Sequence, residues 1–151
     1  MTRLLIRSLP LYVLACGSAH AALLCTVSTL PVAFSSYDSL SASPVDATGQ
    51  VNVSCLGLLS SISYTISLSS GTSGSFSPRQ MALGGNRLNY NLYRDSARTA
   101  VWGDSAANWL SDSYSSLIGA TKSYSVYARL PGSQHVPAGS YADSVIVTVN
   151  Y

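Results

Sequence analysis

The chain has 151 residues, which is enough for one domain with a single hydrophobic core. Only 9% of its residues are charged, against roughly 25% in ordinary soluble proteins, and beyond residue 21 six basic side chains balance six aspartates. Proteins that bind nucleic acids need a basic surplus, so this composition excludes that class, and a net charge near zero favours association with other proteins.

The N-terminus has the features of a secretion signal. Arg3 and Arg7 supply positive charge, an apolar run follows over residues 9–16, and a small-x-small cleavage site ends at Ala21. The apolar run is too short to span a bilayer, so we do not expect an integral membrane protein. We predict cleavage between Ala21 and Ala22 and export of the remaining chain.

Cleavage there divides the chain into a signal peptide, residues 1–21, and one mature domain, residues 22–151. A competing hypothesis is lipid attachment at Cys16, because the four residues that end there loosely resemble a lipoprotein box. The mature domain keeps Cys25 and Cys55, and two cysteines in an exported protein most often form a disulfide. Closing a loop of about thirty residues would stabilise the fold by roughly 3–4 kcal/mol. No ligand cluster surrounds either cysteine, so neither a metal nor another cofactor is expected.

Short stretches in which apolar and polar residues alternate follow one another along the mature domain, and each is typical of a half-buried β-strand. We predict strands over residues 23–34 (interrupted at Pro31), 51–55, 62–68, 81–83, 88–93, 99–102, 123–130 and 141–151. No stretch has sustained helical periodicity. This number of short strands, separated by turn signals, predicts an all-β, antiparallel β-sandwich.

Turns and loops are expected between these strands. Residues 46–49 (DATG) are typical of a turn, residues 69–77 are a glycine-serine loop, and residues 131–139 form a hairpin loop bounded by proline and glycine. Residues 105–118 are compatible with a helical turn or a serine-rich loop, and we predict a loop.

The last predicted strand is the most distinctive, because it is apolar and is not followed by a polar tail. Such a strand should either lie inside a sheet or await a partner, since chain ends usually fray unless something holds them. One face of the strand combines valines and tyrosines with one aspartate: Tyr141, Asp143, Val145, Val147, Val149 and Tyr151.

The residue types that carry catalysis are present but are not arranged for it. A Ser-His-Asp triad would need His135, which lies in the hairpin loop, and the chain has no G-x-S-x-G motif. Asp38, Asp46, Asp95 and Asp104 fall where turns are expected, and aspartate in turns caps backbone amides. The tyrosines mostly alternate within strands, which favours packing over a sugar-binding surface. We therefore predict that the protein is not an enzyme.

Several segments, in order along nearly the whole mature domain, resemble the spore coat protein U domain family. The most specific are YNLYRD at residues 90–95 and GSYADSVIVTVNY at residues 139–151. The family includes subunits of archaic chaperone–usher pili in Gram-negative bacteria. The resemblance implies an immunoglobulin-like sandwich that lacks its final strand and has an open groove beside the C-terminal strand. It also implies a periplasmic chaperone, an outer-membrane usher and neighbouring pilus subunits as partners, with export through the periplasm to the cell surface.

In that arrangement the apolar face of the last strand would bind the chaperone strand or the donor strand of another subunit. The expected groove residues are Tyr141, Val145, Val147, Val149 and Tyr151. An unfilled groove leaves a strand edge unpaired, and an added strand would satisfy both its amides and its core.

The predicted cleavage leaves three residues ahead of Cys25, which at about 3.3 Å per residue cannot fill a groove sized for a full strand. We therefore expect a structural subunit that accepts a strand without donating one, at a tip or another specialised position. Two alternatives stay open: an adhesin that binds sugar or an abiotic surface through loops near Trp102 and Trp109, and a free-standing secreted coat or matrix protein.

Overall fold

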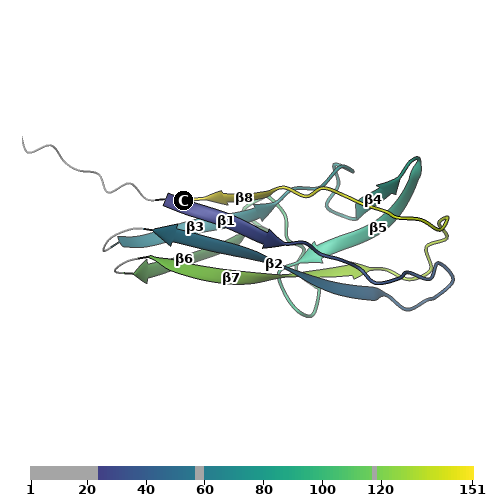
Figure 1. Cartoon of the computed structure of the whole chain (residues 1–151), viewed down its shortest axis with the longest axis horizontal. Coiled ribbons are helices and arrows are strands. Elements are labelled where there is room, and N and C mark those ends of the chain that lie inside the picture. Colours follow the sequence, from purple (N-terminus) through teal and green to yellow (C-terminus); the bar gives the residue numbers. More distant parts are fainter. Residues whose placement is uncertain (1–23, 57–59, 117–118) are drawn as a thin grey trace, which may run out of the picture.

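The structure is a computed structural model that describes residues 24–56, 60–116 and 119–151. The described residues form antiparallel strands in two sheets, as Figure 1 shows. One sheet has the order β1-β2-β7-β5-β4 and the other has the order β6-β3-β8. The strands are β1 (Leu24–Leu30), β2 (Val45–Leu56), β3 (Ser60–Leu68), β4 (Arg79–Leu83), β5 (Asn86–Tyr93), β6 (Leu110–Ser116), β7 (Ala120–Leu130) and β8 (Val147–Asn150). The predicted all-β, immunoglobulin-like sandwich is confirmed.

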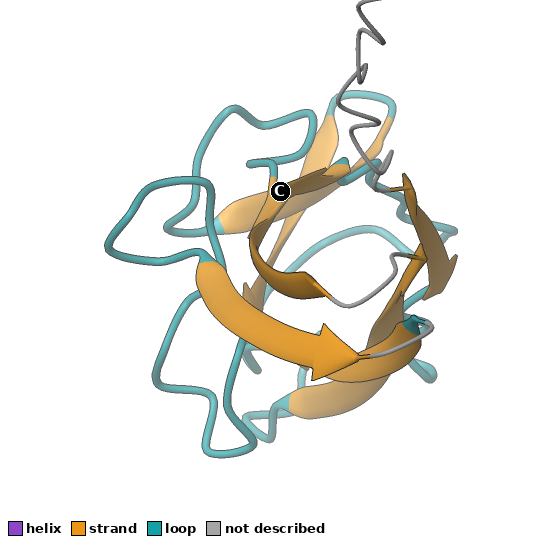
Figure 2. Ribbon diagram, turned by 90° about the vertical axis from the view of Figure 1, so that its left-hand side faces the viewer, coloured by secondary structure: helices purple, strands orange, loops and turns teal. Residues whose placement is uncertain are grey.

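The two sheets curl around one apolar core, seen end-on in Figure 2. The longest ladder joins β2 to β7 and shows why alternation in the sequence produces this arrangement. Val51, Val53 and Val126 point inward and are buried. Their polar neighbours point outward, where Ser123 Oγ donates a hydrogen bond of 2.7 Å to Asn52 Oδ1 across the two strands. None of the described residues belongs to a helix long and apolar enough to cross a membrane.

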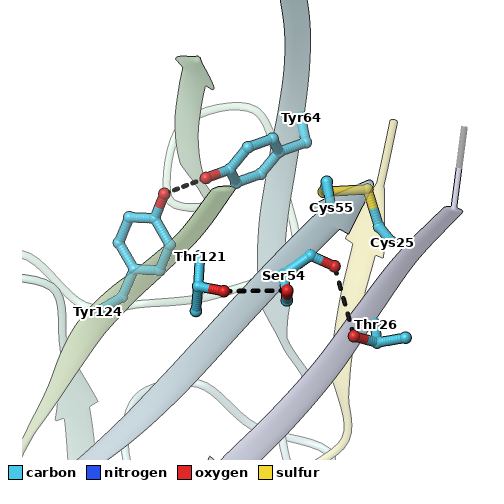
Figure 3. The surroundings of a disulfide bond; sticks show 7 residues. All are labelled: Cys25, Thr26, Ser54, Cys55, Tyr64, Thr121 and Tyr124. Carbon is cyan, nitrogen blue, oxygen red and sulfur yellow. Dashed lines mark hydrogen bonds between the residues drawn. A yellow bond between two sulfur atoms is a disulfide. The ribbon is translucent and has the colours of Figure 1, made fainter. Parts of the chain in front are cut away.

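The predicted disulfide is present and joins Cys25 of β1 to Cys55 of β2 (Figure 3). The two cysteines lie directly opposite each other in the ladder. Beside them, Thr26 Oγ1 donates a hydrogen bond of 3.3 Å to the Ser54 carbonyl, and the hydroxyl groups of Tyr64 and Tyr124 are hydrogen-bonded. The disulfide therefore fixes the start of β1, whose one paired neighbour in the sheet is β2.

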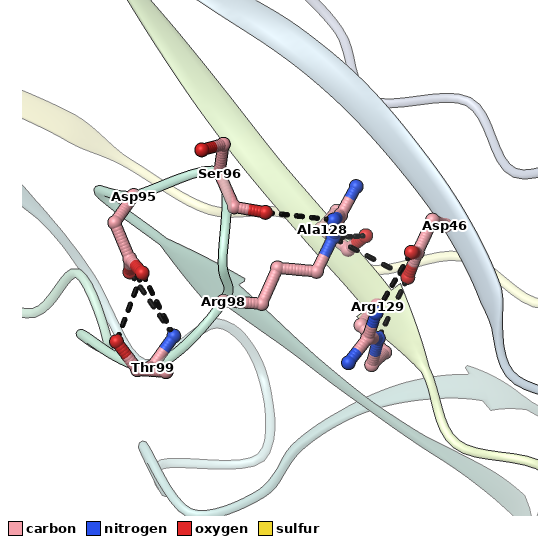
Figure 4. Close-up of polar contacts among 7 residues, drawn as sticks. All are labelled: Asp46, Asp95, Ser96, Arg98, Thr99, Ala128 and Arg129. Carbon is pink, nitrogen blue, oxygen red and sulfur yellow. Dashed lines mark hydrogen bonds and ion pairs between the residues drawn. The ribbon is translucent and has the colours of Figure 1, made fainter.

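The turn predicted over residues 46–49 is wrong, because these residues lie inside β2 and pair with β7. Asp46 accepts two hydrogen bonds from Arg129, of 2.7 and 2.9 Å, and lies 3.3 Å from Arg98 (Figure 4). Gly49 allows a close approach between two backbone segments and is not part of a turn. A Cβ atom there would lie 2.8 Å from the Leu30 carbonyl oxygen, so glycine lets the chain that leaves β1 cross β2.

The loop predicted over residues 105–118 is also wrong in part, since β6 occupies Leu110–Ser116 and pairs with β3. The alternation of apolar and polar residues was weak in this segment because Asp112 occupies an inward position. Its carboxylate accepts hydrogen bonds from Lys122 Nζ at 2.8 Å and from the Tyr124 hydroxyl at 2.7 Å. Both partners come from β7, which the local sequence does not reveal.

The short strand predicted over residues 99–102 is not a strand. It contributes one isolated bridge, between Val101 and Tyr93. The segment before it is a turn held by Asp95, whose carboxylate accepts the backbone N–H groups of Thr99 and Ala100. Figure 4 shows Asp95 capping this turn, in keeping with the capping role expected of it.

Candidate strand-acceptor groove

The C-terminal segment changes sheets along its length. Ala142 forms an isolated antiparallel bridge with Ala82 of β4, whereas β8 pairs with β3 in the other sheet. Between these contacts the loop after β3 takes over the pairing: Ser69 N donates to the Ile146 carbonyl and Ile146 N donates to Ser69 Oγ, both at 2.9 Å. The segment therefore stays extended, and exposure alternates along residues 141–150 as the sequence pattern predicts.

Arg79 of β4 holds that loop in place from inside the core, where it is fully buried. Its guanidinium donates to the carbonyls of Ser69 and Trp102, at 2.8 and 2.7 Å, and to Asn91 Oδ1 at 2.8 Å. Burial lowers the pKa of Arg79. These acceptors compensate for the water that the guanidinium has lost, as a buried charge requires.

Asp143 ties the C-terminal segment to the same loop. Its carboxylate accepts the Thr72 backbone N–H at 2.8 Å, the Thr72 hydroxyl at 2.7 Å and the Tyr90 hydroxyl at 2.7 Å. Burial acts to raise the pKa of Asp143, but these hydrogen bonds outweigh it and hold the pKa below its ordinary value. Gly71, at φ +72°, makes room for the carboxylate, since a Cβ atom there would lie 2.0 Å from Oδ2.

The N–H and C=O groups of successive residues point to opposite edges of a strand. The residues whose backbone groups are already hydrogen-bonded therefore show which edge of the segment is free. Ala142 and Ile146 direct their backbone groups toward β4 and the Ser69 loop. The odd-numbered residues between and after them, including Val145 and Val147, therefore direct theirs to the other edge. No described strand pairs there, because β8 is the last strand in its sheet.

A second free edge belongs to the first strand, β1. The Cα atoms of Cys25 and Cys55 are 4.0 Å apart, the close spacing of an opposed pair that is not hydrogen-bonded to each other. Cys25, Val27 and Thr29 therefore direct their backbone groups away from β2. Among the described residues no strand pairs with this side of β1.

An elongated groove lies between these two edges. Its first part is a cavity of about 460 Å³, with residues 29–32 on one wall, residues 141–145 and Val147 on the other, and a floor that includes Leu68 and Val126. Its second part, about 650 Å³, continues between residues 32–39 and 136–141. The two parts share four lining residues: Val32, Phe34, Met81 and Tyr141. In Figure 1, β1 and β8 run along the same long side of the molecule.

The structure brings together three of the five expected groove residues, since Tyr141, Val145 and Val147 line the first cavity. Val149 packs partly buried against the core beyond the end of that cavity. Tyr151 is 57% exposed and lines a separate shallow hollow with Thr65 and Ser63. The expected cleavage residues, Ala21 and Ala22, and the lipidation candidate Cys16 lie outside the described residues.

The opposite wall of the groove was not predicted, although its residues Val32 and Phe34 fall within the strand expected over residues 23–34. Val32 and Phe34 alternate with exposed neighbours and pack partly buried against the core, although they follow Pro31 and belong to no ladder. The available signal was that alternation, which begins directly after Pro31.

The residues considered for other chemistry do not converge on a site. Trp102 is completely buried and its Nε1–H donates to the Ile66 carbonyl at 2.9 Å, so its side chain is not available for contact with a ligand at the surface. Trp109 is half-buried, and its carbonyl accepts a hydrogen bond from Arg94. His135 is exposed in its loop. Within the described ranges, no group of three or more His, Cys, Asp or Glu residues is placed to hold a metal ion.

Residues 13–148 match the family model described as the Spore Coat Protein U domain. The chain belongs to this family. It is 32% identical over 129 residues to "Protein U" of Myxococcus xanthus, a match that covers 78% of this chain and 70% of that relative. The family predicted from the sequence is thus confirmed, and it is one of structural proteins, in agreement with the prediction of no enzymatic activity.

Among solved structures, the spore coat protein U domain described here is similar to a chain in the CsuC-CsuE chaperone-tip adhesion subunit pre-assembly complex from archaic chaperone-usher Csu pili of Acinetobacter baumannii. The TM-score is 0.59 at 21% identity, and the match covers 86% of this chain. It spans 40% of the length of that neighbour, so the likeness concerns the fold of one part of it.

Proposed function

We propose that this protein is an exported structural subunit of a chaperone–usher type pilus or surface coat, which accepts a β-strand from a partner protein in the groove between β1 and the C-terminal segment. The observation that carries the proposal is the groove itself: two strand edges with unpaired backbone groups flank an elongated cavity with an apolar floor. An inserted strand would pair with both edges and place alternate side chains in the cavity. That is the chemistry of strand complementation.

The partners that fit are proteins with an extended segment whose apolar side chains alternate. A periplasmic chaperone would supply such a strand before assembly, an outer-membrane usher would exchange it, and a neighbouring subunit would supply the final one, at the cell surface of a Gram-negative bacterium. The support is membership of the family and the likeness in fold to a subunit complex named for a chaperone and a tip subunit.

We further propose that the subunit accepts a strand without donating one. This rests on the expected cleavage between Ala21 and Ala22, which leaves three residues before Cys25. The adhesin alternative, which uses loops near Trp102 and Trp109, cannot use the Trp102 side chain for contact because it is buried. The free-standing coat protein is the alternative that an experiment must separate.

The test is a titration of the purified, disulfide-bonded mature protein with a synthetic strand. A suitable peptide has twelve residues, blocked termini and valine alternating with serine or asparagine. Binding to the folded state at a hundredfold excess over Kd stabilises by about 2.7 kcal/mol, which raises Tm by on the order of 10 °C. A Tm unchanged by this peptide, by a shuffled control and by strands of pilus relatives would favour the free-standing coat protein.

A further inference from the structure

The first cavity of the groove is lined by uncharged side chains with one exception, the carboxylate of Asp143, among the described residues that form its walls. The carboxylate is held rigidly. Oδ1 accepts three hydrogen bonds, from the Thr72 backbone, the Thr72 hydroxyl and the Ser144 backbone, at 2.8, 2.7 and 2.8 Å. Oδ2 accepts one, from the Tyr90 hydroxyl at 2.7 Å.

The carboxylate is also charged and has no ion-pair partner among the described residues. The ion pairs of the described chain involve Asp46 and Asp112. The Asp143 charge acts to raise the pKa of the buried Arg79, but the guanidinium directs its donors to carbonyls and to Asn91. The groove therefore carries a fixed negative charge in one wall, with an apolar floor beside it.

An inserted strand would reduce the access of solvent to this charge. Side chains that share the inward face of a strand repeat every two residues, so the inserted strand passes Val147, Val145 and Asp143 in successive steps. An apolar side chain at the third step would leave the charged carboxylate in a less solvated site without a compensating donor, and an acidic one would add repulsion between like charges.

We propose that Asp143 determines which strand the groove accepts. The strand carries apolar residues beside Val147 and Val145, and at the next inward position, beside Asp143, it carries a side chain that donates a hydrogen bond, such as asparagine, threonine or lysine. Aspartate and glutamate are rejected there. Selection therefore works as much by exclusion of unsuitable strands as by attraction of the suitable one. This inference rests on the strand-acceptor function proposed above.

The experiment uses the mature, disulfide-bonded protein and the alternating valine peptide, with asparagine or aspartate placed at each inward position in turn. The pair differs in charge at nearly constant shape. At the one inward position that lies beside Asp143, replacing valine with asparagine should change Kd less than threefold. Aspartate at that position should weaken binding at least tenfold relative to asparagine. At the other inward positions asparagine should itself weaken binding about tenfold or more, because it meets an apolar floor.

The Asp143→Asn variant tests the cause. It keeps the acceptor for Thr72, and its amide nitrogen faces a Tyr90 hydroxyl that can turn to accept. In this variant the aspartate-to-asparagine ratio of Kd values at the selected position should fall at least fivefold, to that of the other positions. Asp104→Asn, at an exposed residue outside the groove, should leave the ratio unchanged.

The outcomes are distinct. Because the position scan on the unaltered protein needs no variant, a destabilised Asp143→Asn protein would not prevent the test. Peptides that bind with the same asparagine penalty at every inward position, or a ratio that survives Asp143→Asn, would overturn the role of Asp143 and leave the strand-acceptor function standing. No binding by any peptide would overturn both.

Discussion

Removal of the Cys25–Cys55 disulfide should destabilise the protein and weaken its groove together. The bond closes a loop of 30 residues. In the chain-entropy model, closing a loop of this length lowers the entropy of the unfolded chain, which stabilises the folded state by about 3.6 kcal/mol at 25 °C. Most domains are stable by about 5–15 kcal/mol, so this is a large part of the total. For a domain of this size we expect Tm to fall by roughly 10 °C.

The effect on the groove follows from the position of β1. Among the described strands it lies at the end of its sheet and pairs with β2 alone, and its side chains beyond Cys25 are exposed. Without the disulfide, the ladder to β2 is what holds this wall of the groove. The peptide should therefore bind the Cys25→Ala/Cys55→Ala variant more weakly than the oxidised protein, even at a temperature where both are folded.

Urea unfolding of the oxidised protein, the reduced protein and the double-alanine variant measures the first effect, and peptide titration measures the second. Thr26→Val is the matched control, because it removes one hydrogen bond of 3.3 Å from the same strand and should cost about 1 kcal/mol or less. A reduced protein within 1 kcal/mol of the oxidised one, with equal peptide affinity, would refute the argument that the disulfide fixes β1.

Three further outcomes are expected. Val147→Asp should abolish peptide binding, because it places a charge in the cavity wall, whereas Asn150→Asp on the outward face should be tolerated; equal effects in titrations would mean that the faces are assigned wrongly. Gly49→Val should lower the free energy of unfolding by roughly 1–3 kcal/mol, while Gly85→Ala, with nothing within 4 Å of its added Cβ, should be nearly neutral in urea titrations. Hydrogen bonds lower the pKa values of four carboxylates, those of Asp46, Asp95, Asp112 and Asp143. Their contribution to stability is therefore complete above the unfolded pKa of about 4 and should be lost as pH falls through the folded values. Tyr90 has a pKa raised by burial and by its hydrogen bond to a carboxylate, so stability should also decline above about pH 10, and a profile flat at both ends would contradict these assignments.

Strands with an apolar face that packs on the core could be predicted from local alternation alone. The segments at Ile62–Leu68 and Leu88–Tyr93 lie within β3 and β5, because their inward residues are buried and their pattern is unbroken. The disulfide followed from cysteine parity together with the expectation of export. These features depend on neighbours in sequence or on composition, and both are visible without coordinates.

The elements that were mispredicted depend on distant partners. Residues 46–49 have the composition of a turn, yet Asp46 pairs with Arg129 and Gly49 accommodates Leu30. Asp112 breaks the apolar face of β6, and only Lys122 and Tyr124 from β7 make that position favourable. A sequence read in short windows contains no information about these pairs.

The candidate site divides in the same way. Its C-terminal wall was predicted, since Tyr141, Val145 and Val147 lie on one face of a strand with a clear period. Tyr151 was expected on that wall, but the ladder with β3 has its last pair at Thr65 and Asn150, and Tyr151 lies beyond it. The N-terminal wall required the crossing at Gly49, which no local pattern specifies.

Natural sheets usually protect their edges with charged side chains, proline or bulges, because an open edge invites pairing with other chains. The two edges that flank the groove lack such protection along their paired lengths: neither β1 nor β8 contains a charged residue or a proline. Asp143 is the nearest charge on the C-terminal side, and its carboxylate is bound to Thr72 and Tyr90 rather than directed along the edge.

The other outer strands differ, since β6 contains Asp112 and β4 is bridged at Ala82 by Ala142. Unprotected edges therefore coincide with the cavity, where an inserted strand would cover them. A protein with little net charge to repel other copies would aggregate through such edges if they stayed open. We infer that the groove must be filled soon after export, and that the partner strand is as much a part of the stable fold as the disulfide.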